Sequence, residues 1–262
     1  MRAATGAPHG GAARRAARAG AWLAAACLAA AAARPAALAA QQVGNPPERS
    51  PYRDIIEHQS ITLFGGQFGG NPGRAGVGAM AAWAFGGQLA VRLSGPVDLW
   101  VTLGEAASRR HSIIADTNVT KTDSARPGPD VNLPLVLADI GLGLNVTGDK
   151  TWHGLAPYVG ASLGIVAPTQ KVTDPGGFTV GTNFSLVPAV GTRYFLGRTL
   201  ALRLEVRDYL FRYQYPLAYF DSLTLHYTGP PPRSAVLPLG TTDRQWVHNL
   251  TLWLGVSYLF TF

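Results

Sequence analysis

Residues 250–262 have the sequence LTLWLGVSYLFTF, in which a large apolar residue occupies every second position up to the chain end. Side chains of a β-strand point alternately to its two faces, so this pattern gives one apolar face and one face of mostly small or polar residues. The apolar face consists of Leu250, Leu252, Leu254, Val256, Tyr258, Phe260 and Phe262. Trp253 and Leu259 are the large exceptions on the other face. The segment therefore predicts a strand with one strongly apolar side.

Alternation of this kind recurs along the chain from residue 60 onward. It is cleanest in residues 200–207, where Leu200, Leu202, Leu204 and Val206 alternate with Ala201, Arg203, Glu205 and Arg207. We count eight such segments bounded by turn-forming residues, and none beyond residue 40 has a helical period. The segments are residues 60–69, 83–93, 97–109, 131–147, 153–168, 178–196, 199–215 and 245–262. The sequence therefore predicts an all-β fold of eight antiparallel strands.

The connections between these segments alternate in length. Short turns join segments two to three, four to five and six to seven, at residues 94–96, 148–152 and 197–198. The other connections are long and rich in glycine, proline or polar residues, and they span residues 70–82, 110–130, 169–177 and 216–244. Short turns on one rim and long loops on the other are typical of an up-and-down transmembrane β-barrel with periplasmic turns. A soluble lipocalin-like barrel is the alternative, and it would have an apolar interior and a polar exterior.

The chain end carries a more specific signal. Residues 258–262, YLFTF, resemble the C-terminal strand of bacterial outer-membrane proteins, which ends in phenylalanine. This resemblance implies that Tyr258, Phe260 and Phe262 form a signal for the barrel-assembly machinery, and that the last strand closes the barrel against the first. From residue 60 onward the architecture resembles the small OmpA-transmembrane-like and OmpX-like barrels. The resemblance implies an eight-stranded barrel in the outer membrane of a Gram-negative cell.

The first 39 residues have the three parts of a secretory signal peptide. Basic residues precede an apolar run at 19–33, and small residues at 37–39 predict cleavage after Ala39 or one residue later. The run is shorter than the roughly 20 apolar residues of a membrane-anchoring helix. Five of the 22 basic residues and no acidic residue lie in this leader, so the net charge of +7 falls to +2 beyond it. The basic balance therefore does not indicate a nucleic-acid partner, and the proline-containing residues 40–59 predict a periplasmic linker.

Cys27 is the only cysteine in the sequence, and it lies in the leader. Acylation of Cys27 as a lipoprotein is disfavoured because Ala24, rather than leucine, lies three residues upstream. After cleavage we expect neither a disulfide nor a thiolate metal site. The sequence also lacks the usual zinc, calcium and phosphate-loop motifs, so we expect no metal site and no cofactor.

If the apolar faces contact lipid, the opposite faces point into the lumen. An eight-stranded barrel is just wide enough for its side chains to fill, so inward polar groups must pair with one another. A lysine or arginine facing lipid near the midplane would cost about 2 to 4 kcal/mol, which also favours the inward position. The residues predicted to form this polar network are Gln88, Arg92, Asp98, Asp139, Asn145, Asn183, Arg193, Arg203, Glu205 and Arg207. We expect a structural salt-bridge core, and a narrow path for ions or small solutes is the alternative.

Residues able to support acyl transfer lie in or near the predicted extracellular loops. They are His111 with Ser108 and Ser112, and His226 with Asp221 and Ser222. Such residues are abundant in loops, so we assign no catalytic residue, although a lipid A-modifying enzyme is a third function left open. We expect an envelope protein with a structural or surface-interaction role and no catalytic activity. Its expected partner is outer-membrane lipid. The long loops either bind an extracellular molecule or shield the mouth of the barrel, and the sequence leaves both alternatives open.

Overall fold

The computed structural model describes residues 50–115, 125–174, 177–220, 236–238 and 240–261. The predicted signal peptide, most of the predicted linker and Phe262 lie outside these residues. Asp221, Ser222 and His226 lie outside them as well. From Pro51 onward the chain folds as one unit.

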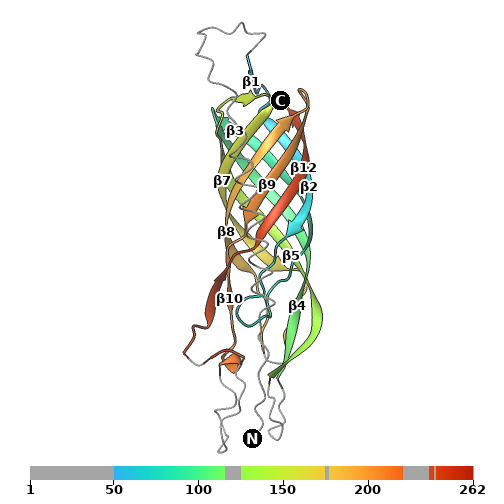
Figure 1. The fold of residues 1–262 in the computed structure, drawn as a ribbon, viewed down its shortest axis with the longest axis vertical. Helices are drawn as coiled ribbons and strands as arrows, with labels where there is room; N and C mark the ends of the chain where they lie inside the picture. The colour runs from blue at the N-terminus through green and yellow to red at the C-terminus, as the bar shows by residue number, and fades with distance from the viewer. Residues whose placement is uncertain (1–49, 116–124, 175–176, 221–235, 239, 262) are drawn as a thin grey trace, which may run out of the picture. The chain divides into compact units, whose positions relative to one another are not determined.

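Eight long strands form a closed antiparallel barrel (Figure 1). They are β2 (Gln59–Phe68), β3 (Ala82–Ser94), β4 (Val97–Ala115), β5 (Ala125–Asn145), β7 (Leu155–Pro168), β8 (Asn183–Phe195), β9 (Leu200–Asp208) and β12 (Leu250–Phe260). Each strand pairs with the next one in the list, and β12 pairs with β2 from Thr251 opposite Phe68 to Phe260 opposite Gln59. The predicted all-β, eight-stranded fold and its closure by the last strand are confirmed.

Closure leaves the barrel wall without a free edge along this seam, so the backbone groups of the first and last strands bond to each other. The alternation that predicted the strands is visible in their exposure. In β9, Leu202, Leu204 and Val206 are exposed, whereas Arg203 and Glu205 between them are buried. The apolar faces point outward on every strand of the barrel, which is the reverse of a soluble lipocalin-like barrel.

Two short strand pairs lie at the two rims. At the short-turn rim, β1 (Tyr52–Asp54) pairs with β6 (Lys150–Trp152), which leads into β7. At the long-loop rim, β10 (Phe211–Gln214) pairs with β11 (Arg244–Val247), and a 3-10 turn, η2 (Leu217–Tyr219), follows β10. The predicted segments 199–215 and 245–262 are therefore each divided into two strands.

The predicted linker is partly structured. Because β7 and β2 lie on opposite sides of the ring of strands, the chain between β1 and β2 crosses the short-turn mouth. Ile55 is buried there, its N–H bonds to the carbonyl of Asp149 at 2.8 Å, and its carbonyl accepts from Arg92 Nη1 at 3.1 Å. Three residues of strand are too few to give a visible alternation, which is why the sequence did not predict β1.

The predicted loop 110–130 needs correction. Strands β4 and β5 continue to pair as far as Ala115 opposite Ala125, past an irregularity between His111 and Ile113. This part of the hairpin extends beyond the barrel wall, where no lipid contact demands one uniformly apolar face. The sequence signal fades there while the backbone pairing continues. The other long connections lie on the same rim as this hairpin, as predicted.

Candidate functional site: the filled lumen

Asp98 is the centre of a polar cluster near the short-turn rim. Its carboxylate accepts from Arg193 Nη2 at 2.9 Å, from Asn145 Nδ2 at 3.1 Å and from Arg92 Nε at 3.4 Å. Arg193 also donates to the side-chain carbonyl of Asn145. These side chains are buried and come from β3, β4, β5 and β8, so Asp98 links four strands across the lumen.

Glu205 is the centre of a second cluster, deeper in the lumen. It accepts from Arg203 Nη2 at 2.6 Å, and it also pairs with Arg207 Nε and with the hydroxyl of Tyr158. Arg203 Nε donates to the Tyr158 oxygen at 2.6 Å. Arg207 Nη1 reaches both carboxylate oxygens of Asp139, at 2.9 and 2.8 Å. Glu205 is therefore the counter-ion that two buried guanidinium groups, those of Arg203 and Arg207, share.

Aromatic rings pack against these arginines and fill the space between the clusters. The Arg203 guanidinium lies 4.7 Å from the ring centre of Tyr158 and 5.7 Å from that of Trp100. The indole N–H of Trp100 donates to Ser162 Oγ at 2.7 Å. Gly160 is where the wall approaches Trp100 closely, because a methyl group there would overlap the indole ring. Charged, aromatic and small residues thus fill the lumen together.

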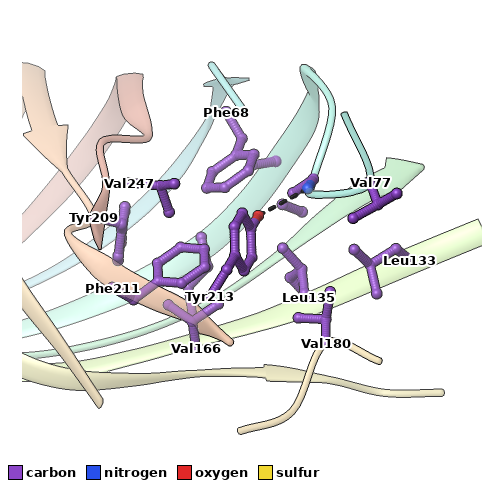
Figure 2. Packing of buried hydrophobic residues seen from close by; sticks show 14 of the residues in the cluster. Phe68, Val77, Leu133, Leu135, Val166, Val180, Tyr209, Phe211, Tyr213 and Val247 are labelled. Carbon is purple, nitrogen blue, oxygen red and sulfur yellow. Dashed lines mark hydrogen bonds between the residues drawn. The ribbon is translucent and has the colours of Figure 1, made fainter. Parts of the chain in front are cut away.

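Toward the long-loop rim the interior changes from polar to apolar. Phe68, Tyr209, Phe211 and Tyr213 pack together with loop residues that fold inward (Figure 2). The buried members of this aromatic cluster include Val77, Ala79, Leu133, Leu135, Val166, Phe178, Val180, Val187, Tyr215, Tyr219, Leu237 and Val247. Tyr213 anchors the loop before β3, because its oxygen accepts the N–H of Ala79 at 2.8 Å. The mouth on this side is therefore closed by an apolar plug.

A buried ion pair fastens the connection between β7 and β8 to this plug. Arg110 Nη2 lies 2.7 Å from Asp174 Oδ1, and both side chains are almost completely inaccessible to solvent. Asp174 also accepts from the Tyr219 hydroxyl at 3.2 Å and from the Ile113 N–H at 3.3 Å. Burial, and then the adjacent Asp174 carboxylate, raise the pKa of Tyr219 above its usual value. Asp174 thus holds three chain segments together.

The structure brings most of the predicted polar residues into the two clusters. Arg92, Asp98, Asn145 and Arg193 belong to the first, and Asp139, Arg203, Glu205 and Arg207 belong to the second. Gln88 is buried beside them and donates to Thr102 Oγ1 at 3.0 Å. The prediction for Asn183 needs correction, because its amide donates to the carbonyl of Gly181 at 2.8 Å, apart from both clusters. Asn183 has the inward parity but begins β8, beyond the polar part of the lumen.

Sequence reasoning missed the residues that complete the interior. Trp100 lies on the same face of β4 as Asp98, and Tyr158 lies on the same face of β7 as its small residues. Their positions in the alternation could therefore have identified both as lumen residues. The pair of Arg110 and Asp174 had no such signal, because Asp174 lies in a connection without regular alternation. The aromatic plug likewise depends on how the loops fold back.

The catalytic candidates in the described part of the chain do not form an acyl-transfer arrangement. His111 is exposed on the outer face of β4, where Nδ1 contacts Asp130. Ser108 and Ser112 face inward, and their hydroxyls donate to the carbonyls of Met80 and Pro129, each at 2.7 Å. Histidine and serine are therefore on opposite faces of the strand. Within the described residues no group of three or more His, Cys, Asp or Glu side chains is placed to hold a metal ion.

The described part of the predicted assembly signal lies on the outer face of β12. Tyr258 is exposed and its ring stacks on that of Phe260, with 6.1 Å between the ring centres. Phe262 lies outside the described residues. The role of these residues in assembly stays a prediction.

The outer wall is covered by large apolar side chains, among which Leu63 is 70% exposed. The other exposed apolar residues include Leu89, Leu103, Ile140, Leu142, Val159, Leu163, Ile165, Val190, Leu202, Leu252 and Leu254. Trp83, Phe85 and Phe184 flank this band on the long-loop side, and Tyr194 and Tyr258 flank it on the other side. Aromatic residues at both edges of an apolar band mark the two interfaces of a bilayer. The chain is an eight-stranded transmembrane β-barrel.

Comparison with known proteins finds similar architectures but no close relative. The barrel matches no family model and no curated protein sequence. Among solved structures it is similar to Neisserial surface protein A, with 13% identity over 80% of this chain and 98% of that chain, and a TM-score of 0.46. It is also similar to Ail, the attachment invasion locus protein of Yersinia pestis, solved with the heparin analogue sucrose octasulfate. There the identity is 12% over 78% of this chain and 100% of that chain, with a TM-score of 0.38.

No helix within the described ranges is long and apolar enough to cross a membrane.

Proposed function

We propose that this protein is an integral outer-membrane barrel with a structural or surface-interaction role in the cell envelope, and that it has no catalytic activity. It lies among outer-membrane lipids, is inserted by the barrel-assembly machinery, and presents its long-loop rim to the outside of the cell. The observation that supports this proposal best is the interior. Two arginine–carboxylate clusters fill one part of the lumen and an aromatic plug closes the other.

A filled interior argues against transport through the barrel. An ion would have to break the contacts of Asp98 or Glu205 and then pass an apolar region with few groups to replace its hydration shell. The arrangement of His111, Ser108 and Ser112 argues against acyl transfer, because the histidine points away from both hydroxyls. The remaining role for the exposed loops is contact with other molecules.

Fractionation and gel mobility test the membrane assignment. We expect the full chain to appear in the outer-membrane fraction, and to migrate faster on a gel before boiling than after it. A variant lacking Phe262 should give less of the fast-migrating form if the chain end is an assembly signal. A protein that is soluble in the periplasm and shows no mobility shift would overturn the assignment.

Conductance and lipid analysis test the assigned role. In planar bilayers the intact protein should give no stable ion current, and a general porin inserted under the same conditions is the open control. The mass of lipid A from cells that express the protein should match that from cells that express His111→Ala. A current from the intact protein like that of the control, or a lipid A change lost in the variant, would contradict the proposal.

A further inference from the structure

The seam between β8 and β9, which the last short turn joins, opens toward the long-loop rim. Leu186 of β8 and Leu210 form the last pair on this seam, with N–H to carbonyl distances of 3.0 and 2.9 Å. In the same register, Arg212 would face Phe184 and Gln214 would face Thr182. Instead β10 diverges to pair with β11, and no hydrogen bond between the described residues of the two sides continues the seam.

The divergence leaves one edge of β10 without a partner. Tyr215 N–H bonds to the carbonyl of Asp243 at 2.7 Å, and Tyr209 N–H bonds to that of Asn249 at 3.2 Å, so odd-numbered residues face β11. Backbone groups alternate in direction along a strand, so those of Arg212 and Gln214 point away from β11 and into the opening. Among the described residues, none bonds to these groups. An unpaired edge of this kind is a template for another strand.

The opening is a cavity of about 380 Å³ between this edge and residues 177–183. Its floor includes Tyr213 and Val180, which are buried in the aromatic plug. On the opposite wall, the N–H groups of Val180, Gly181 and Thr182 have no backbone partner within the described ranges. The cavity therefore has backbone donors and acceptors along its sides and apolar side chains at its base.

We propose that this slot binds an extended segment of a partner polypeptide, which adds as a strand antiparallel to β10. Its backbone would bond to Arg212 and Gln214, and alternate side chains would point down onto Tyr213 and Val180. Apolar residues suit these inward positions. The inference rests on the proposed function only in that the long-loop rim must be accessible from outside the cell.

The positive charge of Arg212 at the slot favours a partner segment with acidic residues. Arg212 is exposed at the open edge and forms no ion pair with any described side chain. Arg212 lines the opening, whereas Arg244 lies on β11, across β10 from the slot. The Arg212 guanidinium group therefore remains available to an acidic side chain of a bound segment. The preferred partner segment thus alternates apolar with acidic residues.

Binding of synthetic peptides to the full chain in lipid nanodiscs tests the proposal. The probe is a short peptide in which valine alternates with glutamate and threonine. Two matched peptides are its lysine version and a version with methylated amide nitrogens along one edge. We expect the acidic peptide to bind, and the lysine and methylated versions to bind at least about tenfold more weakly, because each loses charge or backbone contacts.

Variants of the protein distinguish binding to the backbone edge of β10 from attraction by general surface charge. Gln214→Pro removes one donor that faces the slot without touching the bonds to β11, and should weaken binding about two- to tenfold. Arg212→Glu should invert the preference between the acidic and lysine peptides. Arg109→Glu, an exposed position on β4 at the same rim, is the control and should change neither affinity.

A disulfide gives a test within one molecule. With Cys27 replaced by alanine, Thr182→Cys and Gln214→Cys should lose peptide binding when oxidised and regain it when reduced, since the cross-link closes the slot. Equal binding of the methylated peptide, or unchanged binding after oxidation to the cross-linked form, would overturn the strand-addition proposal. Either result in protein that still shows the gel mobility shift would leave the barrel assignment intact.

Discussion

Replacing Glu205 by glutamine tests whether the lumen clusters stabilise the barrel. The change keeps the volume of the side chain but removes the negative charge that Arg203 and Arg207 share. Arg207 keeps its two contacts with Asp139, whereas Arg203 keeps the oxygen of Tyr158 and at most a neutral amide oxygen at position 205. One guanidinium group therefore stays buried, at 5% side-chain exposure, without a carboxylate.

The expected loss in free energy of unfolding follows from leaving the Arg203 guanidinium group buried without a carboxylate. Breaking a buried ion pair by removing one member costs about 3 to 5 kcal/mol, because the other charge stays away from water. The double variant with Arg203→Met and Glu205→Leu removes both charges and keeps Arg207 on Asp139. It should recover most of the loss, since replacing a buried pair by apolar residues of similar volume is close to neutral.

Reversible urea unfolding in lipid vesicles, followed by tryptophan fluorescence, measures both effects. Glu105→Gln is the matched control, because Glu105 is an exposed carboxylate on the outer side of β4, and it should change the unfolding free energy by less than about 0.5 kcal/mol. A loss below about 1 kcal/mol for Glu205→Gln would refute the view that the cluster excludes water. A double variant less stable than the single one would refute the assignment of the loss to an unpaired charge.

Three further predictions concern the barrel wall, the anchoring of the plug and the pH dependence of the protein's stability. Gly160→Ala should destabilise the barrel by about 1 to 3 kcal/mol in the same unfolding assay because its methyl group overlaps Trp100, whereas Gly181→Ala has open space and should be close to neutral. Asp174→Asn should speed amide hydrogen exchange in residues 169–174 and 177–182, because it breaks the pair with Arg110, and unchanged exchange would contradict the anchoring role. Because burial raises the pKa of Tyr219 in the folded state, its contribution is complete below the ordinary tyrosine pKa of about 10 and is lost as pH rises further. Stability should therefore fall above that pH, and less steeply in Tyr219→Phe.

The sequence predicted the barrel well because the bilayer imposes a rule on every second residue. Lipid contact requires apolar side chains along one face of each spanning strand, and the lumen tolerates polar ones. Arg203, Glu205 and Arg207 could be assigned to the lumen from parity alone. The partners of each charge could not, since pairing depends on how the eight strands are staggered around the ring.

Where the chain leaves the lipid, alternation in the sequence no longer predicts the structure. Residues 110–115 of β4 and 125–130 of β5 are still paired, although their alternation did not predict a strand. Asp174 and Phe178 enter the plug from a connection with no regular period, and β1 is too short to show one. In these places tertiary packing, rather than a repeating pattern, determines the position of each side chain.

Strand β12 pairs with β2 on one side and with β9 on the other, and both seams extend over most of its length. Because β12 follows the other seven barrel strands in the chain, a ribosome must translate all of them before the wall can close. A chain cut short before Leu250 would carry two bare edges whose amide groups the hydrocarbon layer cannot satisfy. The position of this strand thus makes entry into the bilayer depend on translation of the whole barrel, because a chain that stops before β12 is excluded by its own unpaired backbone.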